Sequence, residues 1–308
     1  MPEYPEVVVY VEKLRALAGG QRLEHVRISH PFLLRTAVPA VTAAEGQRLT
    51  GVERLGKRIV FSFSSPEAAQ KSPTDEIHLV LHLMISGRLH WHQDAVAVPK
   101  KRGLAALDFQ HGTLLLTEAS TQKRASLHVV QGREALQDFD RGGLEVMEAT
   151  LDTFAAALRA ENHTLKRTLT DPTIFSGIGN AYSDEILHRA RLSPFLLSRN
   201  IDDGQIARLF AATQEVLAEF TDRLRVEAGD ALPTRVTAFR DDMAVHGRYG
   251  KPCPACATPV QRIRYAANET NYCPTCQTEG RLLADRALSR LLKDDWPRTV
   301  EELEERRR

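Results

Sequence analysis

All four cysteines of the sequence lie between residues 253 and 276, as two Cys-x2-Cys pairs, CPAC and CPTC. Each pair forms a tight knuckle that can place two thiolates on one ion, and two such pairs complete a tetrahedral four-sulfur zinc site. A redox pair or free thiols are the alternatives, and two matched pairs at this spacing favour zinc over both. Because four protein ligands leave no open coordination position, we expect one structural Zn2+. Its ligands are Cys253, Cys256, Cys273 and Cys276.

The segment between the two cysteine pairs reads TPVQRIRY followed by the turn AANET, which predicts a β-hairpin. Arg262 and Arg264 are two residues apart, so on a strand they project from the same face. Such a face can present two guanidinium groups to phosphates. A solvated surface face explains the same two arginines nearly as well.

The chain opens with MPEYPE, which puts two prolines and two carboxylates ahead of an apolar run. A proline and an acid both suit the start of a helix, because the first amides lack partners and the helix dipole favours negative charge. On these residues alone, a capped helix start is the favoured interpretation. A chemical role for Pro2, Glu3 and Glu6 needs support from the rest of the chain.

A glycine turn precedes a helical pattern in SGIGNAYSDEIL, residues 176–187. Gly177 and Gly179 permit a tight turn, and the helix that Asn180 opens offers free amides and a positive dipole end to a phosphate. A GxG alone is more often only a turn, and without a third glycine it is not a dinucleotide fingerprint. The zinc hairpin that follows makes a nucleic-acid backbone the better candidate ligand.

The elements that must position these residues change in character along the chain. An amphipathic helix is predicted over residues 5–20, and strand-like segments with alternating apolar residues follow to about residue 130. Helical periodicity dominates from residue 148. We therefore expect an α+β multidomain fold. Its parts are an N-terminal helix with a β-sandwich (1–130), a linker (131–147), a helical domain with the loop that follows it (148–244), a zinc ribbon (245–280) and a C-terminal helical extension (281–308).

The composition is that of a globular protein, with 43% hydrophobic and 26% charged residues in 308. The balance of 41 Lys and Arg against 40 Asp and Glu gives a net charge of +1, so a basic surface must come from segregated charge. No segment approaches the roughly 20 apolar residues that span a bilayer, and the N-terminus does not read as a signal peptide. We expect no membrane contact and a cytoplasmic location, associated with the nucleoid in a bacterium.

Taken together, these motifs resemble the formamidopyrimidine-DNA glycosylase and endonuclease VIII family of base-excision enzymes. The resemblance lies in PEYPEV at the start, RLGKRIV around Lys57, HLMISGRL (82–89), SGIGNAYSDEIL, VHGRYGKPCPAC (245–256) and NYCPTC. It extends in order and spacing over nearly the whole chain to residue 280. The family fold it implies is a β-sandwich with an N-terminal helix, a helix–two-turn–helix domain and a zinc ribbon.

The resemblance also implies roles for single residues. Pro2 matches the nucleophilic amine that attacks C1′ and remains as a Schiff base, which requires removal of Met1. Glu3 matches the acid/base, and Glu6 matches a carboxylate that supports the terminus. Lys57 matches a lysine that contacts a phosphate beside the lesion. Lys166 matches a phosphate- or lesion-proximal lysine, and Asn180 matches the phosphate-binding asparagine of the helix–two-turn–helix motif.

The sequence departs from the family pattern where the family fills the gap left by a flipped base. Ile85 stands at the position of a family methionine, and EASTQKRAS (118–126) replaces a loop that carries an arginine and a phenylalanine. Gln122, Lys123 and Arg124 are the candidates to fill the gap in another way. The alternative is that the substrate is not an ordinary duplex lesion.

Two further departures lie near the C-terminus. Asn268 occupies the place of a family arginine that binds phosphates. Loss of this cation should remove about one phosphate contact and reduce the salt dependence of DNA binding accordingly. Arg262 or Arg264 can substitute for it. The helix-like DRALSRLLKDDW extends beyond the usual end of the ribbon and could cover the core or bind a partner.

The resemblance implies a monomeric DNA glycosylase with abasic-site lyase activity, acting on double-stranded DNA that contains a damaged, oxidised base or an abasic site. The alternative is a protein on the same fold that binds damaged DNA without turnover, and a weaker one is a zinc ribbon that binds RNA or protein. Intact Pro2, Glu3 and Lys57 favour the enzyme. The lesion, the opposite base and the type of elimination do not follow from the sequence.

Overall fold

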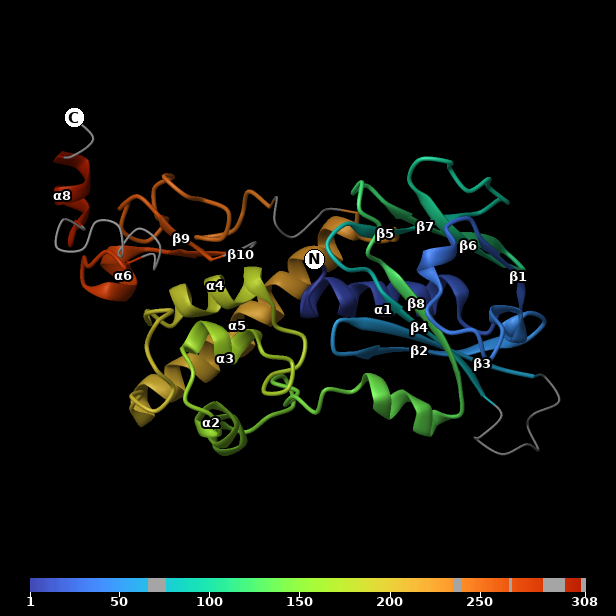
Figure 1. Ribbon diagram of the computed structural model, residues 1–308, viewed down its shortest axis with the longest axis horizontal. Coiled ribbons are helices and arrows are strands. Elements are labelled where there is room, and N and C mark those ends of the chain that lie inside the picture. Colours follow the sequence, from blue (N-terminus) through green and yellow to red (C-terminus); the bar gives the residue numbers. More distant parts are fainter. Residues whose placement is uncertain (66–75, 235–239, 266–267, 285–296, 306–308) are drawn as a thin grey trace. The chain divides into compact units, whose positions relative to one another are not determined.

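The computed structural model describes residues 1–65, 76–234, 240–265, 268–284 and 297–305 (Figure 1). The chain divides into two compact units, one formed by Met1–Arg141 with Phe220–Thr237 and the other by Gly142–Glu219 with Ala238–Arg308. Helix α5 (Asp203–Ala228) contributes residues to both units. No helix within the described ranges is long and apolar enough to cross a bilayer.

Helix α1 (Tyr4–Ala18) opens the first unit and buries one of its faces. Val7, Leu14 and Ala18 recur at helical spacing and are fully buried. Pro5 lies in the first turn, where its missing N–H is not needed. Gly20 ends the helical segment with a φ of 75°, a backbone conformation that favours glycine.

Two four-stranded antiparallel sheets form the body of the first unit, with the strand orders β1-β6-β7-β5 and β2-β3-β4-β8. One hydrophobic core joins the two sheets to α1, through residues such as Leu14, Phe61, Leu79, Leu114 and Leu116. The expected helix with a β-sandwich is therefore confirmed. The strands are β1 (Leu23–Ile28), β2 (Arg48–Leu55), β3 (Arg58–Ser64), β4 (Ile77–His82), β5 (Gly87–His92), β6 (Gly103–Phe109), β7 (Gly112–Glu118) and β8 (Ser126–Gln131), and the 3-10 helices are η1 (Pro31–Leu33), η2 (Val41–Ala44) and η5 (Arg133–Phe139).

Two features of the sandwich differ from the pattern in the sequence. The apolar run IHLVLHLMIS predicts a strand over residues 77–86, but β4 ends at His82 and a turn brings the chain back into β5. Gly87 permits this turn, because a Cβ there would lie 2.3 Å from the carbonyl oxygen of Leu83. SLHVVQ is short and half polar, so its own pattern gives little strand signal, yet it forms β8. It forms because β4 offers it a partner, with Ile77 opposite Gln131 and His82 opposite Ser126.

The second unit combines helices with a two-stranded ribbon. Phe154 anchors the helices, with ring centroids 4.8 Å from Phe175 and 5.2 Å from Phe210. The helix predicted over residues 285–296 lies outside the described residues, as do residues 266–267 of the hairpin. The elements of this unit, besides the start of α5, are α2 (Leu151–Arg159), α3 (Leu165–Thr170), α4 (Asn180–Arg189), β9 (Gln261–Tyr265), β10 (Asn268–Tyr272), α6 (Pro274–Thr278) and α8 (Val300–Glu305).

A buried carboxylate on α4 fastens the segment that leads into the ribbon. Glu185 is 4% exposed, and its two oxygens accept three consecutive backbone N–H groups, those of residues 244–246, at 2.7, 2.9 and 2.9 Å. Burial raises the pKa of this carboxyl, while the three amide bonds work in the opposite direction. The helix and the entrance to the ribbon are therefore held by one side chain.

We expect Glu185→Ala to destabilise the protein by about 3 kcal/mol or more, because three buried amides lose their acceptor. Glu185→Gln keeps an acceptor oxygen and should lose less. Urea unfolding of the zinc-loaded protein measures both. Glu215→Ala is the matched control, since Glu215 is 60% exposed in its ion pair with Arg189 and should change stability by roughly 1 kcal/mol or less. Equal losses in Glu185→Ala and Glu215→Ala would contradict the anchoring role.

Candidate active site and zinc centre

The N-terminus is buried in the first unit between two carboxylates. Glu3 and Glu6 are each 2% exposed, and Pro2 is buried beside them. The backbone N–H of Glu3 donates to Glu6 Oε2 at 2.9 Å, and the Glu3 side chain accepts from the backbone of Glu6. This capping box holds the first residues in one conformation, in contrast to the frayed start of most chains.

Burial lowers the pKa of the N-terminal amine of Met1 below its ordinary value. Glu3 and Glu6 work against this by favouring the ammonium form, and the positive charges of Arg88 and Lys57 add to the lowering. The terminus thus lies among two acids and two cations, in a setting that raises the neutral fraction of an amine near pH 7.

His82 lies in the same group of charges. It is the first residue of the motif HLMISGRL, but the sequence alone gave no reason to assign it a role. Burial lowers its pKa to about 4, and Arg58, Lys57, His128 and the N-terminal amine lower it further. Its Nδ1 accepts the backbone N–H of Met84 at 3.2 Å. His82 is therefore a neutral imidazole at pH 7 beside Lys57, the turn lysine between β2 and β3.

Two donors of the first unit hold consecutive carbonyls after α5. The Tyr10 hydroxyl donates to the Pro233 carbonyl at 2.5 Å, and Arg88 Nε donates to the Thr234 carbonyl at 3.2 Å. Burial raises the pKa of Tyr10 to about 12, so its hydroxyl stays protonated as a donor. Residues 235–239, which follow these two carbonyls, lie outside the described residues.

The residues expected at the gap left by a flipped base lie on two loops of the first unit. Ile85 is 52% exposed at the turn between β4 and β5. Gln122, Lys123 and Arg124 lie in the loop between β7 and β8. Arg124 Nη2 donates to Gln122 Oε1 at 2.7 Å, whereas Lys123 Nζ donates to the carbonyl of Glu118 at 2.5 Å.

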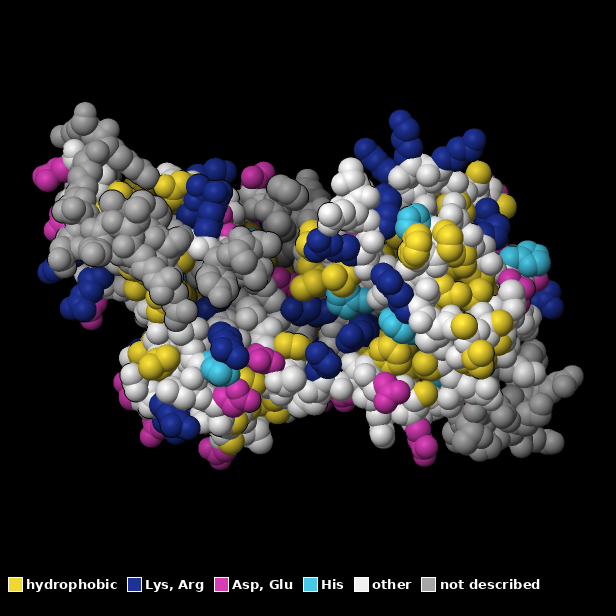
Figure 2. All heavy atoms as spheres, in the orientation of Figure 1, with side chains coloured by type: hydrophobic (Ala, Val, Ile, Leu, Met, Phe, Trp, Pro, Cys, Tyr) yellow, Lys and Arg dark blue, Asp and Glu magenta, His cyan; other side chains and the backbone are white. Residues whose placement is uncertain are grey.

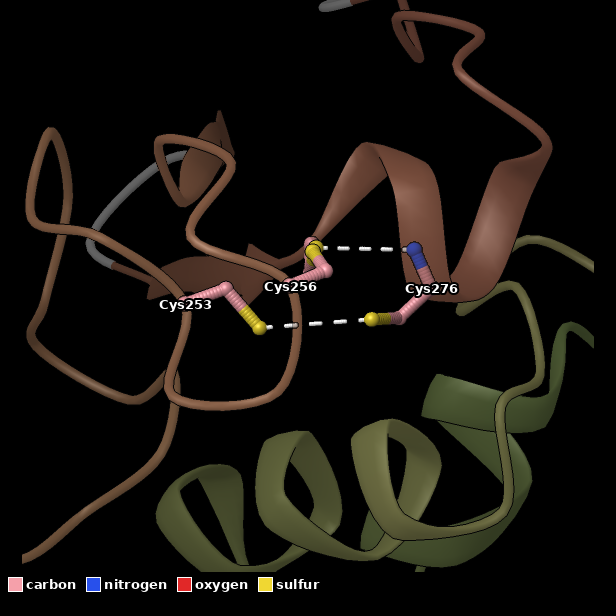
Figure 3. A group of neighbouring side chains, drawn as sticks. Cys253, Cys256 and Cys276 are labelled. Atoms are coloured by element: carbon pink, nitrogen blue, oxygen red, sulfur yellow. Dashed lines mark hydrogen bonds between the residues drawn. The ribbon is translucent and has the colours of Figure 1, made fainter.

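The four cysteine sulfurs of the second unit lie within 4.8 Å of one another. The sulfur atoms of Cys253 and Cys276 are 4.0 Å apart, and those of Cys256 and Cys273 are 3.4 Å apart. Tetrahedral zinc with bonds of about 2.3 Å spaces its sulfurs by roughly 3.8 Å, so this cluster fits the ion. Figure 3 shows Cys253 and Cys276 pointing toward each other, one from the loop before β9 and one from α6. The predicted structural zinc centre is confirmed.

One side chain from α4 reaches the zinc ligands. His188 Nε2 lies 3.2 Å from the sulfur of Cys253. Hydrogen bonds of this kind orient the ligands of a metal site and temper their charge. The cysteine pattern alone gave no signal for this contact, because His188 lies 65 residues upstream of Cys253.

Lys166 lies in a buried network of the second unit. Its ammonium donates to Asp184 Oδ1 at 2.5 Å, to Ser183 Oγ at 2.8 Å and to the carbonyl of Asn180 at 2.7 Å. The lysine is 8% exposed and Asp184 is 1% exposed. These contacts are structural, and the expected role of Lys166 beside a phosphate or lesion stays a prediction.

The glycine turn and the ribbon are joined by Asn180 and Asp184. Asn180 begins α4, and its side-chain amide donates to the carbonyl of Glu269 on β10 at 2.8 Å. Asp184 Oδ2 accepts the backbone N–H of Asn271 at 3.1 Å and lies 2.8 Å from His246 Nδ1. The candidate phosphate-binding turn is thus tied to the strand that carries Asn268.

Both hairpin arginines contact the same carboxylate, as expected for one strand face. Glu269 Oε2 lies 3.5 Å from Arg262 Nη1 and 3.3 Å from Arg264 Nε. The Arg262 guanidinium also stacks over the Tyr249 ring at 4.0 Å from its centroid. Arg264 is the more exposed of the two, with 64% of its side chain accessible.

Three segments of the chain match domains of a single class of enzyme. Residues 1–129 match the formamidopyrimidine-DNA glycosylase N-terminal domain, and residues 144–225 match the formamidopyrimidine-DNA glycosylase H2TH domain. Residues 250–278 match the zinc finger found in FPG and IleRS. With the helix and sandwich, the helical segment and the four-cysteine centre, these matches define a DNA glycosylase.

Individual relatives extend the likeness over nearly the whole chain. A formamidopyrimidine-DNA glycosylase of Thermus thermophilus is 33% identical over 297 residues, covering 91% of this chain and 100% of the relative. The crystal structure of the MutM (Fpg) protein from Thermus thermophilus is 32% identical, with a TM-score of 0.71 over 90% of this chain and 98% of that one. The complex of Lactococcus lactis Fpg with abasic-site DNA shares the fold, with a TM-score of 0.76 at 22% identity over 90% and 99% of the chains.

The chain therefore belongs to the formamidopyrimidine-DNA glycosylase family. The resemblance inferred from its motifs and the expected enzyme class are confirmed.

Removal of the zinc should destabilise the second unit. Structural zinc contributes on the order of 10 kcal/mol of apparent folding free energy in small zinc domains. We expect one zinc per chain by atomic absorption, loss of that zinc in Cys276→Ser, and a lower melting temperature for this variant. Thr275→Ala is the control, because it removes only the Thr258–Thr275 hydroxyl contact of 2.8 Å beside the cluster. Stoichiometric zinc in Cys276→Ser would refute the four-sulfur assignment.

Proposed function

We propose that this chain is a bifunctional DNA glycosylase and abasic-site lyase that acts through the amine of Pro2 once Met1 has been removed. The observation that carries the proposal is the buried terminus, where Pro2 lies beside the buried carboxylates Glu3 and Glu6 and burial lowers the pKa of the Met1 amine that precedes it. A binding protein has no need for such a site. The same family membership supports double-stranded DNA with a damaged base or an abasic site as the substrate.

The reaction begins with nucleophilic attack by the Pro2 nitrogen on C1′ of the damaged nucleotide. The bond between C1′ and the base nitrogen breaks, and the base leaves with the bonding electrons and takes up a proton. The nitrogen then loses its proton, the C1′–O4′ bond breaks as the ring oxygen takes up a proton, and the nitrogen lone pair forms the C=N bond of an iminium ion at C1′. Loss of a proton from C2′ and cleavage of the C3′–O bond nick the strand by β-elimination.

Glu3 and Glu6 divide the acid–base work in this proposal. Glu6 Oε2 accepts the N–H of Glu3 at 2.9 Å, so Glu6 holds the terminus in place. Glu3 then moves protons at the sugar ring oxygen or at C2′, as its buried place beside Pro2 allows. A carboxylate beside the amine also stabilises the positive charge of the iminium ion.

Lys57 and the neutral His82 form the phosphate side of this site. Lys57 supplies a positive charge for a phosphate beside the lesion, and a neutral imidazole can donate a hydrogen bond without adding a second charge. Lys57 also lowers the pKa of the Met1 amine, and we expect the same effect on the Pro2 amine once Met1 is removed.

The second unit supplies DNA contacts that carry no chemistry. Asn180 and the amides of the α4 N-terminus suit one phosphate, and Arg262 and Arg264 suit others. Glu269 neutralises part of the hairpin charge, so we expect Arg264, the more exposed arginine, to make the stronger phosphate contact. The zinc holds the hairpin and takes no part in the reaction. A DNA substrate also agrees with the expected location in the cytoplasm beside the nucleoid.

Borohydride trapping tests this function directly. We expect the Met1-processed protein to form a covalent complex with a duplex that contains an abasic site, and protein with a blocked N-terminus to form none. Glu3→Gln should trap but release a nicked strand at least about 100-fold more slowly, the usual size of a lost general acid–base contribution. Mass spectrometry of the purified protein establishes whether Met1 is present. Tight DNA binding without any trapped complex would instead identify a binder without turnover.

The trapping rate should rise with pH, because only the neutral amine attacks. Burial lowers the pKa of the Met1 amine, and Pro2 is buried at the same place. For the Pro2 amine that removal of Met1 creates, we therefore expect the midpoint of this rise below the ordinary terminal-amine value of about 8.0. Lys57→Gln removes one of the charges that lower this pKa, so the midpoint should move to higher pH. Single-turnover rates at saturating enzyme separate this effect from weaker DNA binding. Lys13→Gln, on the same helix, is the control, and an equal shift in both variants would contradict the assignment.

A further inference from the structure

Glu118 joins the two loops that carry the residues expected at the flipped-base gap. It ends β7 directly opposite Gly87, the first residue of β5, and is 1% exposed. One carboxylate oxygen accepts the hydroxyl of Ser86 at 3.3 Å, and the other accepts the backbone N–H groups of Arg124 and Ala125 at 2.9 and 3.1 Å. The two loops therefore share one buried carboxylate.

Both backbone polar groups of Glu118 are hydrogen-bonded, as its side chain is. Its N–H donates to the carbonyl of Arg102 at 2.8 Å, and its carbonyl accepts the ammonium of Lys123 at 2.5 Å. Lys123 thus braces its own loop from within. Burying a carboxylate is costly unless its oxygens are hydrogen-bonded, so this residue is tolerated only because the loops supply its donors.

The first loop presents one apolar side chain at a fixed place. Ile85 is 52% exposed, although a large apolar side chain normally packs away from water. Met84 before it has a φ of 52°, and the N–H of Gly87 donates to the carbonyl of Leu83 at 2.9 Å, which closes the turn. Ser86 then links this turn to Glu118. The turn is constrained on both sides of Ile85.

The second loop presents a polar pair. The guanidinium of Arg124 donates to the side-chain oxygen of Gln122 at 2.7 Å, and both side chains are exposed. The pair offers free guanidinium N–H groups and the amide NH2 of Gln122, and such donors can read base edges. Figure 2 shows Lys and Arg side chains along the upper right edge of the first unit. The exposed residues Lys100, Lys101 and Arg102 precede β6, and the carbonyl of Arg102 accepts the N–H of Glu118.

We infer that Glu118 is a positioning residue that assembles Ile85 and the Gln122–Arg124 pair into one preformed reader of the base opposite the lesion. Ile85 occupies the gap in the stack, and the Gln122–Arg124 pair hydrogen-bonds the base that has lost its partner. Lys123 is assigned to bracing the loop and not to contacting DNA. The inference rests on the proposed function, since it concerns how that reaction selects its duplex.

Duplex and single-stranded substrates distinguish a reader from the catalytic terminus. A single-stranded abasic site has no opposite base and no stack to fill, so the reader contributes nothing there, whereas the amine chemistry is the same. We expect Glu118→Ala and Arg124→Ala to lower the borohydride trapping rate on abasic duplex about tenfold and to leave the rate on the single strand unchanged within about twofold. The preference among the four opposite bases should flatten in both variants.

Three further variants serve as a rescue, a partial disruption and a control. Glu118→Gln retains an oxygen that accepts the two backbone N–H groups, so it should restore most of the duplex rate and the opposite-base preference. Ser86→Ala cuts the link to the Ile85 turn without removing the carboxylate and should give a partial loss on duplex only. Lys101→Gln removes a nearby exposed charge and should not change the opposite-base preference. Arg124→Ala and Ser86→Ala decide the question if Glu118→Ala does not fold.

The outcomes separate the two proposals. If the unmodified protein traps neither substrate, the proposed function fails. If the unmodified protein traps both substrates, the proposed function stands. The reader is then overturned if the Glu118, Arg124 and Ser86 variants lose as much trapping rate on the single strand as on the duplex, or if they lose no trapping rate at all. The reader is supported if these variants lose trapping rate on the duplex only and Glu118→Gln restores most of it.

Discussion

The buried N-terminus is the constraint on which the rest of the first unit depends. A terminal amine normally lies in water, where it is charged and mobile. Here the Glu3–Glu6 capping box starts α1 at Tyr4, and Val7, Leu14 and Ala18 pack that helix into the sandwich core. The terminus is thereby fixed to the best-packed part of the unit. The proposed nucleophile must be both placed and neutral, and burial favours both properties.

In the second unit, two adjacent buried acids of α4 hold the surrounding elements in place. Asp184 binds Lys166 on one side and Asn271 on the other, while Glu185 receives the three amides of residues 244–246. Consecutive residues of a helix point in different directions, so one turn of α4 can hold a helix, a loop and a strand at once. The zinc then needs to organise only the ribbon itself. The candidate phosphate-binding turn is held by the contacts of Lys166, Asp184 and Asn180 within the second unit.

Sequence reasoning succeeded where spacing alone dictates geometry. Two Cys-x2-Cys pairs leave few arrangements besides a four-sulfur site, and the alternation of apolar residues predicted the helix and the sandwich. It could not find contacts made by distant segments, such as His188 with Cys253 or Glu118 with Ser86. Lys166 shows the same limit, because its neighbours in sequence say nothing about Asp184. The motif HLMISGRL contained His82 and Arg88, yet only the fold brings them to the charges around the terminus.

Several cations of this nearly neutral chain are used within the protein itself. Lys166 is buried in an ion pair, Arg88 binds the Thr234 carbonyl, and Lys123 braces its own loop. These positive charges form contacts inside the protein. They therefore add little to the electrostatic attraction of DNA. Exposed cations such as Arg124 and Arg264 act locally, each on the loop or strand that carries it. A DNA enzyme built in this way selects its site through placed contacts more than through general electrostatic attraction, which ties its specificity to the rigidity of the loops that carry them.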